Sequence, residues 1–182
     1  MAEFKLKDIC EFNKFGVKDL NKEENINYLD TSNLVHGDVI EYQKYLLRDA
    51  PSRAQRKVEE NTILYSLVRP NLCHYGFIPK PVKNLVASTG FVTINLKQEY
   101  EGMIDIRFVY LLLTQNWLTE HLHTIAENAV SAYPSLNPSD IENLSFNFPP
   151  TDTQKQITTS LFDLQNKIDV NREINRNLPL SA

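Results

Sequence analysis

Cysteine, glycine and long apolar runs are scarce in this sequence, and each scarcity excludes a class of protein. Only Cys10 and Cys73 are present in 182 residues, too few for a disulfide scaffold, and we interpret both as buried thiols in a reducing compartment. The five glycines are widely separated, so there is no glycine-rich loop to cradle a nucleotide or a methyl-donor cofactor. No apolar run reaches the roughly 18 residues of a membrane-spanning helix, and the start, MAEFKLKDIC, is too charged for a signal peptide. We therefore expect a cytoplasmic chain that contacts no membrane and uses no cofactor.

Patterns that would indicate catalysis or metal binding are missing or incomplete. His121 and His123 stand two residues apart in a helical segment near Glu127, so the imidazoles point to different sides, unlike ligands four residues apart. Cys73 and His74 are adjacent, and adjacent side chains rarely face each other as a nucleophile and its base must. We expect no catalytic residues and no metal site.

Charge is distributed unevenly along the chain. Between Lys44 and Lys83 there are eight Lys or Arg and three acids, a local balance of +5 in a chain of net charge −4. The densest part is APSRAQRKV, residues 50–58. One interpretation is a basic surface on an otherwise acidic body, which would attract nucleic acid. The other is a solvated face with interspersed charges, and on charge alone both stay open.

Short strands dominate the first hundred residues. With 42% hydrophobic residues, the chain fits one globular domain plus an appendage. The best strand pattern is NTILYSLVRP, in which Ile63, Tyr65 and Leu67 alternate with their neighbours until Pro70. Three other segments favour strands: NINYLDTSNLVHGDVIE with a turn at Gly37-Asp38, CHYGFI, and NLVASTGFVTI with a turn at Ser88-Thr89-Gly90. Together they predict an irregular, mostly antiparallel sheet.

Helical periodicity begins after residue 103. Apolar residues at helical spacing predict one helix, or two in succession, over residues 104–128, with an apolar side that covers the sheet. Asn137 to Asp140 is typical of a helix start with Pro138 at the first helical position, and LSFNFPP favours a last strand. The expected class is a mixed α/β (α+β) fold.

The last segment predicts one long helix. Thr151 and Gln154 have the spacing of a capping box, and residues 151–178 contain no Gly or Pro. Such a helix would be roughly 40 Å long at about 1.5 Å per residue. Residues at coiled-coil spacing form a seam, and we predict that they make a dimer interface: Ile157, Leu161, Leu164, Ile168, Asn171, Asn175 and Leu178. The alternative is that the helix folds back on its own domain.

Several segments taken together resemble the specificity subunit of type I restriction-modification systems. They follow in order over nearly the whole chain: YLDTSNL, PSRAQRKVEENTILYSLVRPN, YGFI, LVASTGFVTI, AYPSLNPSDIENLSFNFPPTDTQKQI and KIDVNREINRNL. The resemblance implies a DNA target-recognition domain at residues 1–150 and a conserved spacer helix at residues 151–182. A full subunit of the family carries two such units, so this chain resembles a half-length form, either naturally short or a fragment.

The resemblance also implies a function without catalysis. In this family each recognition domain reads half of a bipartite DNA target, and the subunit delivers adenine methyltransferase subunits, and then a translocating nuclease subunit, to that target. Residues 147–150, NFPP, have the wrong order for the methyltransferase Asn-Pro-Pro-aromatic motif, because the aromatic residue precedes the two prolines. Because a single unit lacks an intramolecular partner for its seam, we expect a homodimer through antiparallel helices and a palindromic, gapped target. The alternative is a protein-interaction adaptor from a truncated or decayed gene that no longer reads DNA.

The basic segment supplies the candidate DNA contacts. Arg53, Arg56 and Lys57 precede a predicted strand in a turn-forming stretch, where cations would neutralise phosphates and Ser52 and Gln55 would donate hydrogen bonds. Four flanking cations are further candidates, each with an ordinary solvated role as the open alternative: Lys44, Arg48, Lys80 and Lys83.

Overall fold

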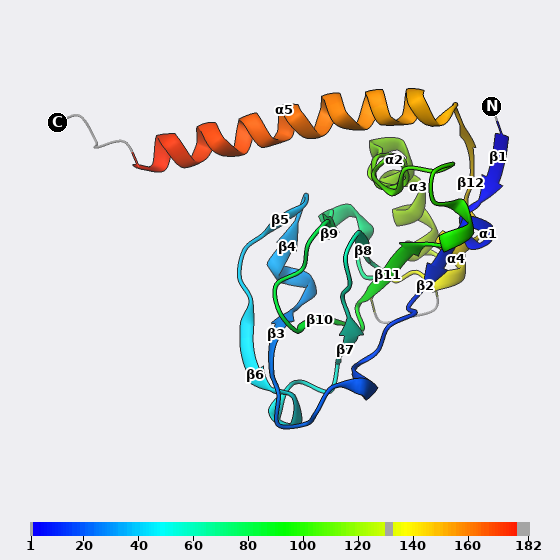
Figure 1. Ribbon diagram of the computed structural model, residues 1–182. Coiled ribbons are helices and arrows are strands. Elements are labelled where there is room, and N and C mark those ends of the chain that lie inside the picture. The colour runs from blue at the N-terminus through cyan, green and yellow to red at the C-terminus, as the bar shows by residue number, and fades with distance from the viewer. Residues whose placement is uncertain (1, 130–132, 178–182) are drawn as a thin grey trace.

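Short strands build most of the structure, and the computed structural model describes them within residues 2–129 and 133–177 (Figure 1). In chain order they are β1 (Ala2–Lys5), β2 (Cys10–Phe12), β3 (Asn25–Leu29), β4 (Leu34–Val35), β5 (Asp38–Val39), β6 (Gln43–Leu46), β7 (Ala54–Lys57), β8 (Thr62–Ser66), β9 (Tyr75–Ile78), β10 (Leu85–Ser88), β11 (Phe91–Leu96) and β12 (Ser145–Phe148). They form a core sheet with the order β2-β11-β8-β9, an outer sheet with the order β6-β3-β10-β7, and two pairs, β1-β12 and β4-β5. Among the described strands only β3 and β10 pair in parallel, which agrees with the expected mostly antiparallel arrangement.

Helices pack on the core sheet and connect its strands. The α-helices are α1 (Leu6–Ile9), α2 (Ile106–Leu113), α3 (Asn116–Glu127), α4 (Pro138–Glu142) and α5 (Thr151–Asn177). The 3-10 helices are η1 (Val17–Asp19), η2 (Thr31–Asn33), η3 (Leu47–Asp49), η4 (Pro70–Leu72) and η5 (Gln98–Tyr100). The segment expected as one helix or two is therefore two, α2 and α3. Helix α4 begins as expected with Pro at its first position, and Asn137 and Asp140 close a capping box.

The core sheet lies between two apolar clusters. Ile63 and Tyr65 of β8 pack with Val109, Leu118 and other residues of the helices, while Leu64 packs against the outer sheet. All five residues of β8 are buried, so the strand has no solvent face, although its sequence alternates. A strand covered on both sides gains burial from each face, which overrides the simple alternation rule.

The turn at Ser88-Thr89-Gly90 joins the two sheets. It was expected between two β segments, and it carries the chain from β10 in the outer sheet to β11 in the core sheet instead of closing a hairpin. A Cβ added to Gly90 would lie 2.7 Å from Thr31 Cγ2, closer than van der Waals contact permits. The close approach therefore requires glycine at this turn.

The turn of the small β4-β5 pair consists of His36 and Gly37, one residue before the expected position. Both residues have positive φ, of 50° and 89°, as a tight two-residue hairpin turn with primed geometry requires. The hairpin projects from the outer-sheet side of the domain toward the long helix (Figure 1).

The amino-terminal segment contains three elements that the sequence patterns did not indicate. Strand β1 pairs antiparallel with β12, α1 buries Leu6 and Ile9, and β2 adds an edge strand to the core sheet. Because β12 leads directly into α5, this pairing places the amino terminus beside the start of the long helix (Figure 1).

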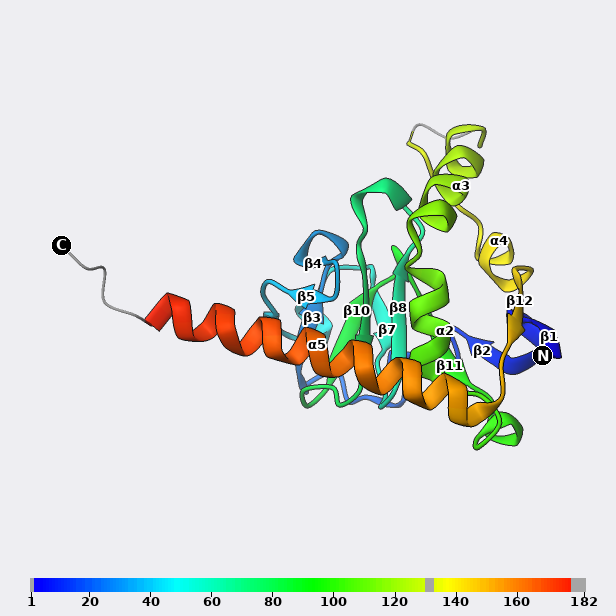
Figure 2. The ribbon, with the colours of Figure 1, turned by 90° about the horizontal axis from the view of Figure 1, so that it is seen from above.

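Helix α5 passes over the domain and extends beyond it. It starts near α2, crosses the β4-β5 hairpin and continues past the outer sheet, as both views show (Figures 1 and 2). None of the helices in the described part of the chain is long and apolar enough to cross a membrane.

Candidate nucleic-acid interface

Four of the seven predicted cations lie in two separate groups at the ends of β10: Lys44, Lys80 and Lys83 at one end and Arg53 at the other. Strand β10 begins at Leu85, opposite Asn27 of β3, and ends at Ser88, opposite Ala54 of β7. The three residue steps between these ends span roughly 10 Å at about 3.3 Å per residue. The structure therefore divides what looked like one basic segment into two surfaces of the outer sheet.

Lysines gather at the first end, around Asn27. Lys44 of β6 is the direct pairing partner of Asn27, whose side-chain Nδ2 donates to the backbone oxygen of Lys83 at 2.8 Å. Lys80 lies in the same connection, three residues before Lys83. All three lysines are exposed, and within the described residues none of them forms an ion pair.

The turn that carries the exposed Arg53 lies at the second end of β10. The backbone oxygen of Arg53 accepts from the Thr89 amide at 2.8 Å, and Gln55 Nε2 donates to the Ser52 backbone oxygen at 2.7 Å. Ser52, Arg53 and Gln55 are exposed. The turn itself ends at Arg53, so the expectation that residues 55–57 lie in a loop is wrong: they belong to β7, because they pair with β10.

Two of the candidate cations are already neutralised. Arg48 Nη1 lies 2.6 Å from Glu23 Oε1, and Lys57 Nζ lies 2.6 Å from Glu59 Oε1. Both pairs are partly or largely exposed, so water and salt screen them. A phosphate would have to replace a carboxylate at each of these positions.

Arg56 has a structural environment. Its side chain is half-buried, burial lowers its pKa, and its Nε has no hydrogen-bond acceptor within the described residues. Its backbone bridges Gly16 and pairs with Ala87, so it joins β10 to the segment before η1.

Helix α5 contacts the domain through a stripe of residues at four-residue spacing. We call it the polar stripe after its first two members, Gln154 and Thr158. Gln154 and Thr158 are 1% and 0% exposed, and Phe162 is half-buried. On a helix that turns about 100° per residue, this stripe lies beside the predicted seam but does not coincide with it. The fold-back alternative therefore holds in part: α5 does contact its own domain, but through a different face from the seam.

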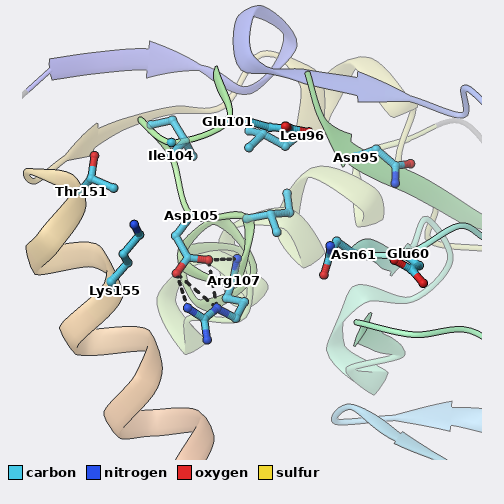
Figure 3. Close-up of a pocket in the computed structure, with 12 residues that line it drawn as sticks. Glu60, Asn61, Asn95, Leu96, Glu101, Ile104, Asp105, Arg107, Thr151 and Lys155 are labelled. Atoms are coloured by element: carbon cyan, nitrogen blue, oxygen red, sulfur yellow. Dashed lines mark hydrogen bonds and ion pairs between the residues drawn. The ribbon is translucent and has the colours of Figure 1, made fainter. Parts of the chain in front are cut away.

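The polar stripe binds the residues that start α2, and we call this contact the joint. The Asp105 carboxylate accepts from the Arg107 amide at 2.9 Å and from Arg107 Nη2 at 2.7 Å (Figure 3). It also accepts from Thr158 Oγ1 at 2.8 Å. Burial by itself raises the pKa of the Asp105 carboxyl, but the hydrogen bonds from Arg107 and Thr158 outweigh burial and hold this pKa below its ordinary value.

Gln154 forms the second half of the joint. Its Oε1 accepts from the Asp105 amide at 3.0 Å, and its Nε2 lies 3.2 Å from the Met103 oxygen and 2.8 Å from the Pro149 oxygen. Thr151 Oγ1 also donates to the Met103 oxygen, at 2.8 Å. The two residues expected to close a capping box instead bind the loop before α2.

A pocket of about 530 Å³ lies beside the joint. Figure 3 shows Lys155 and Thr151 on its α5 side, Asp105 and Arg107 in the middle, and Glu60 and Asn61 on the opposite side. Asp105 and Arg107 are bonded to each other, so these two polar residues of the pocket serve the joint.

Aromatic rings continue the contact along α5. The Phe162 ring lies 5.8 Å from Phe77 and 6.2 Å from Tyr110, measured between centroids, and the Arg107 guanidinium lies 5.9 Å from its centre. Further along, Arg172 Nη1 is 3.6 Å from Asp38 at the hairpin tip. The three rings, Arg107 and Asp38 border a cleft of about 640 Å³ between α5, α2 and the hairpin.

The predicted seam is exposed. Ile157, Leu161, Leu164 and Ile168 are 38%, 45%, 56% and 45% exposed, and Asn171 and Asn175 are also exposed. Leu178 lies outside the described residues. Four large apolar side chains on one helix face are thus left without a partner in the described chain, as a surface that binds another molecule requires.

The residues considered for metal or nucleophilic chemistry do not form a site. His121 is exposed, and His123 Nε2 lies 3.4 Å from Glu127 Oε1. Cys10 is buried, and burial raises its pKa to about 12. Cys73 is only half-buried, at positive φ after η4, so the expectation that both thiols are buried is wrong for Cys73.

Comparison with known proteins decides the family. A family model described as type I restriction modification DNA specificity domain matches residues 1–180. This chain belongs to that family. The specificity subunit of the type I restriction enzyme HindI from Haemophilus influenzae is 29% identical over 160 residues, which cover 88% of this chain and 34% of that protein. The specificity-subunit resemblance drawn from the sequence is thereby confirmed, and the chain spans about a third of that relative's length.

Solved structures of type I specificity subunits show the same fold. The HsdS subunit from Thermoanaerobacter tengcongensis aligns with a TM-score of 0.75 at 21% identity, over 95% of this chain and 44% of that one. The S subunit from M. genitalium aligns with a TM-score of 0.58 at 19% identity, over 94% and 41% of the two chains. The expected mixed α/β fold with a long carboxyl-terminal helix is confirmed.

Sequence reasoning missed the joint. Asp105 precedes the first helical residue of α2 by one position, as helix-capping residues do, and Gln154 and Thr158 are polar residues four apart on a helix with an apolar seam. The four-residue spacing of Gln154 and Thr158 is the signal that could have indicated a second face of α5. Only the fold shows that this face binds Asp105.

Proposed function

We propose that this chain reads one half of a bipartite DNA target and positions adenine methyltransferase subunits there, together with a nuclease and translocase subunit. The observation that carries the proposal is the family match over residues 1–180. In this assignment residues 1–150 are the target-recognition domain, and residues 151–182 are the spacer and dimerisation helix. The chain acts in the cytoplasm as a non-catalytic subunit, and the methyl transfer belongs to its partner.

Duplex DNA is the proposed ligand of both ends of β10. Four exposed cations form no ion pair within the described residues, and they neutralise backbone phosphates: Arg53 at one end and Lys44, Lys80 and Lys83 at the other. Ser52 and Gln55 donate hydrogen bonds beside Arg53. The remaining three candidates play lesser parts: Arg48 and Lys57 exchange their carboxylates for phosphates, and Arg56 supports β7.

A second copy of the chain is the proposed partner of the seam. The exposure of the seam's described residues, Ile157, Leu161, Leu164, Ile168, Asn171 and Asn175, supports this assignment. An antiparallel helix pair buries the apolar residues of both copies, and the two asparagines restrict its register. Leu178 completes the interface. The pair gives the assembly a twofold axis, so its target is palindromic with a fixed gap.

The methyltransferase subunit binds the exposed sides of α5 that the seam and the polar stripe leave free, within residues 155–176. This part of the helix lies almost entirely in solvent, and it carries acids and bases interspersed along its surface. Such a surface is typical of a polar rim around an interface.

Methylation mapping tests the proposal directly. The chain is co-expressed with the methyltransferase subunit encoded beside it, and N6-methyladenine is mapped across the host DNA. We expect a gapped, palindromic methylated sequence that disappears when this chain is omitted. An asymmetric sequence would retain target recognition and refute the symmetric dimer. No methylation, from a pair shown to associate and to bind the methyl donor, would refute target recognition and favour the adaptor.

Charge reversal tests the two ends of β10. Arg53→Glu combined with Lys83→Glu places acids at one exposed position in each group, and avoids the half-buried Arg56. Each lost phosphate contact lowers the salt slope of DNA binding by about 0.9, so we expect a slope reduced by about 2 and weaker binding at low salt. The matched control is Lys5→Glu, an exposed lysine on β1. An unchanged affinity across the salt series, in a stably folded double variant, would remove both residues from the interface.

A further inference from the structure

The joint between α5 and the domain consists of directional polar bonds. Asp105 begins α2, and its carboxylate binds both Arg107 of the same helix and Thr158 of α5. Its amide binds Gln154 Oε1, so one residue is held by two consecutive turns of α5. The Asp105 side chain is 8% exposed and Thr158 is 0% exposed, so little water reaches the hydrogen bond between these two residues.

Directional bonds restrict the tilt of the helix more tightly than apolar contacts do. Apolar side chains slide past one another at little cost, whereas a buried hydrogen bond weakens steeply when its angle or length changes. The Thr158 hydroxyl and the Gln154 amide lie one helical turn apart, so tilting α5 about one of them distorts the other. Burial of the Phe162 ring against Phe77 and Tyr110 adds a third point on the same stripe.

A small tilt at the joint becomes a large displacement at the end of the helix. Thr158 and Asn175 are seventeen positions apart, which is roughly 25 Å at about 1.5 Å per residue. A tilt of about 10° then moves the far end by roughly 4 Å, more than the rise of about 3.4 Å per base pair of DNA. A recognition unit attached beyond that end would therefore change register on DNA by about one base pair.

The second attachment of α5 is weak. Arg172 and Asp38 meet at 3.6 Å with more than half of each side chain exposed, and Arg172 also lies 3.4 Å from Asp169 of its own helix. An exposed pair shared in this way gives little resistance to tilting. The angle of the helix therefore depends on the joint.

From these observations we propose that the buried joint formed by Asp105, Arg107, Gln154 and Thr158 sets the gap between the two half-sites by fixing the angle between the recognition domain and α5. These are positioning residues, since none of them faces the proposed DNA surface. The inference rests on the proposed function for its consequence on DNA, but the angle itself is measurable without DNA.

The variants that test the joint differ by single groups. Thr158→Val keeps the shape of the side chain and removes the hydroxyl, whereas Thr158→Ser keeps the hydroxyl. Thr153→Val makes the same change at an exposed threonine of α5. Asp105→Asn is the second disrupting variant, for use if Thr158→Val does not fold, because it keeps an acceptor and removes only the charge.

The first measurement is the distribution of distances between spin labels on the domain and the far part of the helix. Labels are attached at Glu120→Cys and Glu173→Cys, with Cys10 and Cys73 replaced by serine, and labelled chain is diluted into unlabelled chain. We expect one narrow distribution for the parent, Thr158→Ser and Thr153→Val, and a broadened or shifted one for Thr158→Val. An unchanged distribution in both disrupting variants would overturn the inference, whatever the protein does on DNA.

The second measurement is the methylation map of the same variants without labels. We expect Thr158→Val to methylate the parental half-sites at gaps that differ by about one base pair, roughly 3.4 Å, and the serine variant to restore the parental gap. A broadened distance distribution with an unchanged gap would overturn the joint's role in spacing. If the parent methylates no sequence, the proposed function fails, the spacing role fails with it, and the label distances still decide whether the joint fixes the angle.

Discussion

The two sides of α5 differ in chemistry and in what they contact. The stripe toward the domain is polar at its start, where Gln154 and Thr158 are buried and fully bonded. The seam beside it is apolar, yet residues such as Leu164 and Ile168 are about half exposed. In an isolated globular domain the opposite arrangement is usual, because apolar side chains face the core.

The two faces of α5 therefore have different tasks. The polar stripe holds the helix at a defined angle, because its bonds depend on direction. The apolar seam is suited to a second helix, because apolar burial between separate chains is strong and needs no exact geometry. A helix that used its apolar face for its own domain would have nothing comparable to offer a partner.

The largest effect is expected from a charge in the seam. Leu164→Asp should weaken self-association at least about 25-fold, since a buried Leu contributes about 2–5 kcal/mol and each tenfold step takes about 1.4 kcal/mol. Sedimentation over a concentration series measures the strength of self-association. Asn166→Asp adds the same charge on the other side of the helix and should leave association unchanged. A Leu164→Asp variant that still dimerises like the parent would refute the seam assignment.

A smaller effect is expected from a substitution in the polar stripe. This substitution should lower the stability of the fold instead of weakening self-association. Gln154→Leu leaves the Asp105 amide and the Pro149 oxygen without this partner, at about 1–3 kcal/mol for each buried unpaired group, whereas the Met103 oxygen keeps its bond from Thr151. We expect the free energy of unfolding to fall by about 2–3 kcal/mol in urea titrations.

The measurement uses the Leu164→Asp background, so that dimerisation does not contribute. Gln156→Leu is the matched control, since it makes the same change at an exposed position of α5. Equal losses from the two leucine variants would show that the stripe has no special role in stability.

The smallest effect is a pH dependence at the joint. Since the pKa of folded Asp105 lies below its ordinary value of 3.8, its carboxylate stabilises the fold above that pH, and this contribution is lost as pH falls through the folded-state pKa. The stability difference between the parent and Asp105→Asn should therefore shrink as urea titrations are carried from about pH 6 to about pH 2. Asp152→Asn makes the same change at an exposed carboxylate of α5 and is the matched control. A difference that grows on acidification would contradict the bonds assigned to Asp105.

Much of the secondary structure could be predicted from local sequence patterns. Alternation, turn residues and helical periodicity predicted β8, the turn at Ser88 to Gly90 and the start of α4, because each depends on neighbours a few residues apart. The family was accessible because its motifs run in order along the chain. Strand β1 and the division into two sheets were not accessible, since β1 pairs with residues 145–148 at the other end of the domain.

The composition of the candidate site could be predicted from the sequence, but the arrangement of its residues in space could not. The excess of cations between Lys44 and Lys83 is visible in the sequence, but their separation to opposite ends of β10 depends on how three strands pair. The pairing of Arg48 with Glu23, and the burial of Arg56, also arise from contacts between distant segments.

The sequence by itself determined that the segment from residue 151 onward forms a long helix with an apolar seam, because helix formation and its periodicity are properties of one continuous segment. The tertiary structure alone decided which face of that helix binds the domain. That choice was made by Asp105, which lies 53 positions before Thr158 in the chain and reaches it only after α2 has packed on the core sheet.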